Sequence, residues 1–437
     1  MPVGPAPRST VRLSPLQALN VYLPFRSRRL HARLHRLCVA LVSRGVSAFR
    51  RPATPAHRVT THTETCTQSD HPAILVIDTA APRPDRDSGS LRLHTLMGLL
   101  VSLGYAVTLY CEEQAPSDDD AERLRSIGVR VLSPASGNPT WLFEDASRYC
   151  VTITCRYHLA WSWLPLLRRA LPHALHILDT VDLHHLREQR EADLHRSMLR
   201  RAFSALTRRH EMRAIRRADA TWVVSTIERD YLLDLLPDAR IDVVPNLHEA
   251  VEHVAPFEDR DGLLFVGGGR HPPNVDAVAW LLHDILPRIR ARLPGVRLHV
   301  VGDGIADAAG IVRDAHAGVT FHDHVPDLAP LLARCRSSIA PLRFGAGVKG
   351  KVTQALVHGL PVVTTPNGAE GLHLDHGVHA LVVDTASALA DAAATVHEDA
   401  ALWQRLSANG RLIMQQRFSL DHVRDTLAAR LPPIART

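Results

Sequence analysis

The sequence predicts an α/β protein made of two doubly wound, Rossmann-like parallel sheets. Between His71 and Asn246, short apolar runs alternate with longer helical stretches, which is typical of a parallel sheet covered by helices on both faces. The same alternation begins again after residues 247–260, a stretch with no steady period. One core rarely grows beyond about 250–300 residues. A chain of 437 residues therefore fits two such domains with additional segments.

The apolar runs set the boundaries of the expected strands. In the first half these are Ala73–Asp78, Val107–Tyr110, Val129–Leu132, Cys150–Thr154, Ala174–Asp179, Thr221–Ser225 and Ile241–Val244. In the second half they are Gly262–Val266, Val296–Val301, Gly318–His322, Ser337–Pro341, Pro361–Thr365 and His379–Asp384. Helices are expected from Ser90 for about four turns, and over 187–217, 274–292, 351–359, 386–396, 400–417 and 420–430.

These elements divide the chain into five parts. We expect an arm and linker at 1–70, a first domain at 71–246, an interdomain linker at 247–260, a second domain at 261–418 and a C-terminal helical segment at 419–437.

The net charge of +6 comes from the arm. Residues 1–70 hold eleven arginines against Glu64 and Asp70, so the rest of the chain is slightly acidic and predicts no general basic surface for nucleic acid. Four leucines fall on one helical face within residues 26–51, with arginines on its flank, which indicates an amphipathic helix suited to an anionic membrane surface. A disordered tail, or a helix covering part of a domain, are the alternatives.

The cysteines and histidines show no metal pattern. The six cysteines lack paired zinc spacings, and the 27 histidines are scattered without an HExxH motif. We therefore expect reduced, buried thiols, a cytoplasmic protein and no bound metal.

The stretch from Ile339 to Gly371 has the features of an anion site. An apolar run leads into a loop with three glycines, including Gly347, and a helix starts near Lys351. Glycines let the backbone approach a ligand, and the first turn of a helix presents unpaired N–H groups. Lys349 and Lys351 are the only lysines among 51 basic Lys and Arg residues, which favours a requirement for compact ammonium groups beside phosphate oxygens. The alternative is that they only solvate a loop.

A second glycine loop follows the first strand of the second half. Gly268, Gly269 and Arg270 come directly after that strand, and Asn274 lies near the next helix start. An arginine beside glycines suits bidentate contacts to a diphosphate. A surface arginine in a flexible loop would give the same pattern.

The segment GAGVKGKVTQALVHGLPVVTTPNGAEG resembles the donor site of the retaining family 4 glycosyltransferases, above all bacterial surface-polysaccharide (O-antigen type) members. The resemblance covers about residues 73–430. It implies the GT-B fold, in which two Rossmann-like domains face a cleft, the second holds a nucleotide-diphosphate sugar, and the final helix crosses back to the first. Gln354 departs from the wider family, whose glutamate at this place binds the donor ribose hydroxyls.

The resemblance also assigns residues in the first half. It implies that Gly89 faces the donor phosphates, with Ser88 and Arg92 towards the acceptor. Within DTVDLHHLREQRE it implies that Asp182 and His184 are catalytic-site groups, with weaker support for the neighbouring His185 and Arg187. Taken alone, these polar residues would be read as helix caps, although they follow a strand end, where open α/β folds place ligands.

Together these features predict a metal-independent hexosyltransferase without a cofactor. It would move a sugar from a nucleotide-diphosphate sugar to a glycan or lipid-linked acceptor in surface-polysaccharide synthesis. Retention is implied only by the resemblance, and with inversion Asp182 would become the general base. A sugar-nucleotide epimerase of the same fold and a noncatalytic nucleotide-sugar-binding protein, the latter suggested by Gln354, remain as alternatives.

Overall fold

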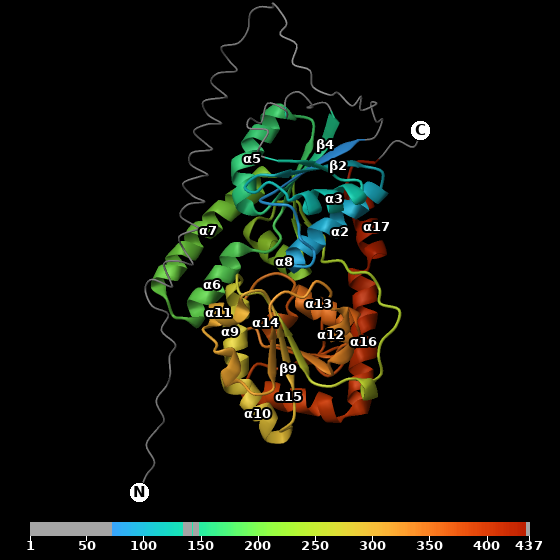
Figure 1. The fold of residues 1–437 in the computed structure, drawn as a ribbon. Coiled ribbons are helices and arrows are strands. Elements are labelled where there is room, and N and C mark those ends of the chain that lie inside the picture. The colour runs from blue at the N-terminus through green and yellow to red at the C-terminus, as the bar shows by residue number, and fades with distance from the viewer. Residues whose placement is uncertain (1–71, 134–141, 143–147, 434–437) are drawn as a thin grey trace, which may run out of the picture. The chain divides into compact units, whose positions relative to one another are not determined.

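The computed structural model describes residues 72–133, 142 and 148–433 (Figure 1). The predicted arm at 1–70, with its amphipathic helix at 26–51, lies outside the described residues.

The first half contains a seven-stranded parallel sheet in the order β3-β2-β1-β4-β5-β6-β7. Its strands are β1 (Ala73–Asp78), β2 (Ala106–Cys111), β3 (Arg130–Leu132), β4 (Tyr149–Cys155), β5 (Leu175–Asp179), β6 (Ala220–Val223) and β7 (Ile241–Val243). All six residues of β1 are buried, which explains why its sequence is an unbroken apolar run up to Asp78.

The second half contains a six-stranded parallel sheet in the order β10-β9-β8-β11-β12-β13. Its strands are β8 (Leu263–Val266), β9 (Leu298–Val301), β10 (Val319–His322), β11 (Ser337–Ala340), β12 (Val362–Thr364) and β13 (Leu381–Val382). The structure confirms the predicted fold class and every predicted strand. In each sheet the strand order reverses beside the first strand of that half, at β1/β4 and at β8/β11, and ligands bind such sheets beyond the strand ends at this point.

Helices connect the strands in both halves (Figure 1). In the first half they are α2 (Ser88–Ser102), α3 (Asp118–Ser126), α5 (Tyr157–Ala170), α6 (His184–Leu194), α7 (Met198–Arg217) and α8 (Thr226–Leu235). In the second half they are η3 (Phe257–Asp259), α9 (Pro272–Trp280), η4 (Leu281–Ile285), α10 (Leu286–Arg292), α11 (Ile305–Ala309), η5 (Arg313–Ala315), α12 (Ala329–Arg334), α13 (Gly350–Val357), α14 (Pro366–Ala369), α15 (Ala386–Glu398), α16 (Ala400–Phe418) and α17 (Leu420–Arg430).

Two expected helices are interrupted. The predicted helix over 187–217 is two helices, because Arg196 has a φ of 49° and Ser197 caps a new helix by accepting the N–H of Arg200. The predicted helix over 274–292 contains a π-helical turn between α9 and α10. Neither break is marked by a glycine, so the sequence pattern runs through both.

The last helix packs on the first half of the chain. Trp403 and Leu406 of α16 belong to the core of the second sheet, whereas Val423 and Leu427 of α17 lie in the core of the first sheet together with Leu431. Among the described residues, no helix has both the length and the apolar character needed to span a membrane.

Candidate functional site

The loop between β11 and α13 brings Lys349 into a buried position. Gly347 has a φ of 69°, a left-handed conformation that favours glycine. Lys349 follows it, is only 8% exposed, and donates from Nζ to the carbonyls of Gly347 at 2.5 Å and Ala346 at 3.2 Å. A carboxylate oxygen of Glu370 lies 3.8 Å from the same Nζ. The lysine is thus held against the glycine loop at the start of α13.

Lys351 lies in the first turn of α13, one residue after Gly350. Its Nζ donates to the side-chain oxygen of Asn274 and sits 5.5 Å from the ring centroid of Phe265. Within the described part of the chain, no carboxylate forms an ion pair with it. Burial, followed by the charge of Lys349, lowers the pKa of Lys351 to about 7, and burial lowers the pKa of Lys349 to about 8 despite the opposing effect of Glu370. Lys351 is therefore a half-buried cation that lacks an anion among these residues.

Two glycine loops of the second half pack directly against each other. A Cβ on Gly269 would lie 2.4 Å from the carbonyl oxygen of Gly304, and a Cβ on Gly302 would lie 2.0 Å from that of Gly267. The side chain of Asn274 donates to the Gly268 carbonyl at 3.0 Å. Asn274 thereby links this loop to Lys351, and the glycines are needed for the close approach of the two backbones.

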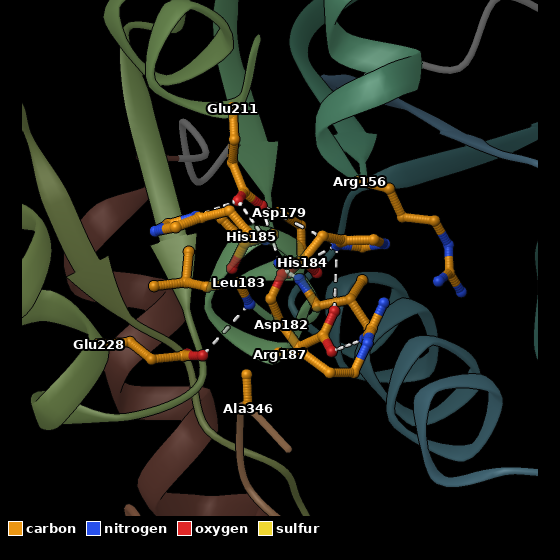
Figure 2. A network of polar contacts seen from close by, with 12 residues as sticks. Arg156, Asp179, Asp182, Leu183, His184, His185, Arg187, Glu211, Glu228 and Ala346 are labelled. Carbon is orange, nitrogen blue, oxygen red and sulfur yellow. Dashed lines mark hydrogen bonds and ion pairs between the residues drawn. The ribbon is translucent and has the colours of Figure 1, made fainter. Parts of the chain in front are cut away.

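The polar loop after β5 forms a network around Asp182 (Figure 2). His184 Nδ1 lies 3.1 Å from one Asp182 oxygen, and Arg187 donates to the other. Although burial favours the neutral acid, Arg187 and His184 hold the pKa of Asp182 well below its usual range. Burial lowers the pKa of His184 below its ordinary value, and Asp182 opposes that shift. Val181, a β-branched residue, has a φ of 64°, which is costly and common at functional sites.

Glu211 anchors this loop from the neighbouring helix α7 (Figure 2). Its carboxylate is 0% exposed and accepts the backbone N–H groups of His184 at 3.1 Å and His185 at 3.2 Å. It also lies 2.5 Å from His185 Nδ1, and His185 Nε2 lies 2.9 Å from the Tyr231 hydroxyl. The start of α6 is therefore fixed by a buried acid. The helix expected over 187–217 gave no sign of this role, because only the fold brings Glu211 to the start of α6.

A second buried acid lies beside the same loop. Glu228 accepts the N–H groups of Leu183 at 3.4 Å and Val224 at 3.3 Å, and burial followed by repulsion from Asp182 raises its pKa to about 8.

The two halves meet at the predicted residues. A Cβ on Gly350 would lie 2.2 Å from the Ser88 Cβ, and a Cβ on Gly347 would lie 3.1 Å from the Asp182 Cβ. Gly89 lies beside Val181, at 3.5 Å by the same measure. Ser88 and Asp182 of the first half thus lie beside the loop between β11 and α13, with Gly89 next to Ser88 in the chain and His184 in contact with Asp182.

Other predicted residues lie apart from this cluster. Arg92 is 3% exposed and pairs with Asp179 at 2.6 Å while donating to the Val244 carbonyl at 2.9 Å, so its guanidinium group is buried and engaged within the first half. The Arg270 side chain is 89% exposed and lies 3.6 Å from Asp303. Gln354 is half-buried on α13, three residues after Lys351.

The structure adds an ion pair that the sequence reading missed. Arg190 on α6 pairs with both carboxylate oxygens of Glu370 at 2.6 Å and donates to the Gly345 carbonyl at 2.6 Å. Only the charge of each residue was visible in the sequence, because the partners are 180 positions apart.

Comparisons with known proteins agree with this architecture. Residues 90–248 match the family model described as Glycosyltransferase Family 4, and residues 260–399 match the model described as Glycosyl transferases group 1. Together the two matches cover more than half of the chain. No curated protein sequence matches it.

Several solved structures share the fold. Sucrose-phosphate synthase from Thermosynechococcus elongatus is 16% identical, with a TM-score of 0.62 over 82% of this chain and 98% of that one. Anabaena HepE in complex with UDP-glucose is 16% identical, with a TM-score of 0.61 over 82% and 99%. The pneumococcal O-GlcNAc transferase GtfA in complex with UDP and GlcNAc is 9% identical, with a TM-score of 0.60 over 82% and 98%. At these identities the likeness shows the GT-B fold.

Proposed function

Because the chain belongs to the group 1, family 4 glycosyltransferases, which transfer a sugar from a nucleotide sugar, we propose that it moves a hexose-type sugar to a glycan or lipid-linked acceptor. We place this reaction in surface-polysaccharide synthesis at the cytoplasmic side of a membrane. The resemblance of the α13 segment to O-antigen type enzymes supports this choice of pathway.

The observation that carries the proposal is the lysine pair at the start of α13, in which Lys349 is buried and Lys351 is half-buried. Cleavage of the bond between sugar and phosphate builds negative charge on the leaving diphosphate, and fixed cations aimed at it are the main electrostatic requirement. Lys351 lies at a helix start and has a neutral amide as its partner, so a diphosphate would supply the counter-charge. Lys349, held by the loop carbonyls, would be the second cation.

The remaining donor contacts follow from the surrounding loops. Gly347 keeps the backbone close to the lysines, Asn274 orients Lys351, and Gly268 and Gly269 let their loop approach the diphosphate, as Gly89 would from the first half. Gln354 lies one turn beyond Lys351 and would reach the donor ribose as a neutral hydrogen-bonding group.

Asp182 and His184 would act on the sugar and acceptor. Asp182 is an ionised carboxylate beside the glycine loop, and His184 is a neighbouring imidazole whose pKa is lowered by burial. We propose that they position the transferred sugar and the acceptor hydroxyl. With retention of configuration, the departing phosphate would take the acceptor proton. Ser88, packed on Gly350, would contact the acceptor or donor at the junction of the halves.

A noncatalytic nucleotide-sugar-binding protein is the second candidate, because Gln354 replaces the family's carboxylate. A hydrogen bond to a charged group contributes about 1.5–3 kcal/mol against about 0.5–1.5 kcal/mol for a neutral one. Ribose binding would therefore be weaker here than in relatives with glutamate.

The test combines calorimetry with a turnover assay. The wild-type protein is titrated with UDP, GDP, dTDP and ADP sugars, and nucleotide release is measured with and without a lipid-linked or glycan acceptor. Replacing Lys349 and Lys351 by methionine should abolish nucleotide binding, whereas Arg288→Met, an exposed cation on α10, should not. Binding without acceptor-dependent release would favour the noncatalytic candidate. Unchanged nucleotide binding in the double methionine variant would contradict both the glycosyltransferase and the noncatalytic candidate.

A further inference from the structure

The outward side of α7 begins with exposed apolar side chains. Met198 is 77% exposed, Leu199 is 68% exposed and Leu206 is 38% exposed. The opposite side of the helix is buried and carries Glu211 and Ile215. Met198 and Leu199 lie in the first turn of α7, directly after the chain turns from α6 into α7.

The same side of the helix becomes basic further along. Arg209 and Arg216 follow Met198 by 11 and 18 residues, which is three and five helical turns, and both are exposed. Residues 196–217 contain eight arginines and a single acid, Glu211, which is 0% exposed. Arg200 and Arg201 are neutralised by Glu191 and Asp193 of α6. The outward arginines further along α7 face no acid from their own helix.

We propose that this side of α7, the α7 face (Met198, Leu199, Leu206, Arg209 and Arg216), docks on an anionic lipid surface. Exposed aliphatic side chains enter the boundary between headgroups and acyl chains, and arginines bind the phosphate groups above it. The charge favours this occupant over the N-terminal arm, since residues 1–70 are themselves strongly basic and would be repelled. Duplex nucleic acid offers no apolar layer to Met198 and Leu199.

Docking of the α7 face on a membrane goes beyond the proposed function, because it does not depend on the nucleotide-sugar donor. It does affect where an acceptor in the membrane would meet the site. α6 begins at His184, in the candidate site, and ends just before the apolar start of α7. A membrane contact at the α7 face would therefore lie on the same helical pair as the groups that receive the acceptor.

The experiment uses the full chain and sedimentation with vesicles. Vesicles of phosphatidylcholine alone are compared with vesicles containing 30% phosphatidylglycerol, at several salt concentrations. Met198→Glu with Leu199→Glu should lower partitioning to the anionic vesicles at least tenfold, because two apolar insertions are lost. Both positions lie in the first turn of α7, where acidic residues suit the helix dipole, so the change should not disturb folding.

A matched control separates the α7 face from a general effect of added charge. Val312 is 69% exposed and Leu412 is 52% exposed, and both lie in the second half. Val312→Glu with Leu412→Glu introduces the same two charges and should leave vesicle binding unchanged. The proposal would be overturned if both double variants lost vesicle binding equally, or if Met198→Glu with Leu199→Glu lost none. Absence of wild-type binding to anionic vesicles would overturn it as well.

The arginines of the α7 face allow a second, independent experiment. Arg209→Gln with Arg216→Gln should lower anionic-vesicle partitioning by about fivefold per charge and reduce its salt dependence, while Arg288→Gln with Arg405→Gln should not. Nucleotide affinity is measured for every variant and should remain at the wild-type value, so a failure here is distinct from a failure of the proposed function. Tighter binding to a DNA duplex than to anionic vesicles, lost in the α7 variants, would also overturn the proposal.

Discussion

Arg190 and Glu370 form a two-pronged ion pair that joins the halves of the molecule, with both guanidinium nitrogens 2.6 Å from carboxylate oxygens. Arg190 lies on the helix that begins with His184, and Glu370 also lies near Lys349. The pair thus connects the polar loop of the first half to the lysines of the second.

Breaking this ion pair should weaken the contact between the two halves. We expect Arg190→Gln and Glu370→Gln each to lower kcat/KM, and the double variant to lose less than the sum of the two. The coupling free energy should be about 1–2 kcal/mol, a typical value for contacting residues. Fully additive losses in kcat/KM would show that the pair does not act as a unit.

Replacing Lys351 by methionine should stabilise the unliganded protein while abolishing nucleotide binding. The folded-state pKa of Lys351, about 7, lies below the ordinary 10.5, because burial disfavours the charged form. The resulting loss of folding stability is fully present below about pH 7 and disappears above about pH 10. The melting temperature should rise by about 2–5 °C at pH 7, and by less at pH 9.5. Scanning calorimetry measures both shifts. A lower melting temperature would mean that Lys351 has a structural role.

Nucleotide affinity should fall as the pH rises above about 7. A bound diphosphate favours the charged form of Lys351, so the pKa of this lysine rises on binding. At a pH between its pKa in the free protein and its higher pKa in the complex, binding therefore takes up a proton. Below about pH 7 the lysine is already protonated and affinity should be constant. Titrations in buffers of different ionisation enthalpy measure the uptake. Lys351→Arg, which stays protonated, should remove it; persistence of the uptake in that variant would assign it to another group.

Asp182→Asn should lower kcat by roughly 10²- to 10⁴-fold, the usual range for a positioned acid or base. Affinity for free UDP should not change, because Asp182 belongs to the first half, whereas the nucleotide is proposed to bind the second half. Asp193→Asn, a half-exposed carboxylate on α6, is the matched control. Since the pKa of Asp182 is held far below its usual range, activity should not decline through its protonation between pH 7 and 5. A wild-type kcat in Asp182→Asn would remove this residue from the site.

Gly350→Ala should reduce kcat/KM at least tenfold, because the added methyl group would lie 2.2 Å from the Ser88 Cβ across the junction of the halves. Ser88→Gly in the same chain removes the clash and should recover part of the lost kcat/KM, although it also removes the contact proposed for the Ser88 hydroxyl. Gly98→Ala, where a Cβ meets nothing within 4 Å, should be neutral. Failure of the double variant to recover would place the effect within α13.

The strands could be predicted because their signal is local. Parallel strands buried on both faces, such as β1, require an unbroken apolar run, and that run is visible in the sequence. The break between α6 and α7 could not be predicted in the same way. Arg196 takes its left-handed conformation without a glycine, and the helical period continues through it.

The same distinction holds in the candidate site. Gly347, Lys349 and Lys351 form a contiguous pattern, so the glycine loop and its lysines could be located from the sequence. The burial of Arg92 was not visible in the sequence, because it depends on Asp179, 87 positions away. Glu211 looked like one charge in a basic helix, and only the fold places it under the amides of His184 and His185.

The path of α17 has a consequence for biosynthesis. Val423, Leu427 and Leu431 complete the core of the sheet that begins at Ala73. A ribosome makes this sheet before the second half and makes α17 after it, so an apolar surface of the first half stays uncovered until α17 has been synthesised. Chains truncated before Val423 would therefore leave the apolar core of the first sheet exposed, and they should aggregate through that surface.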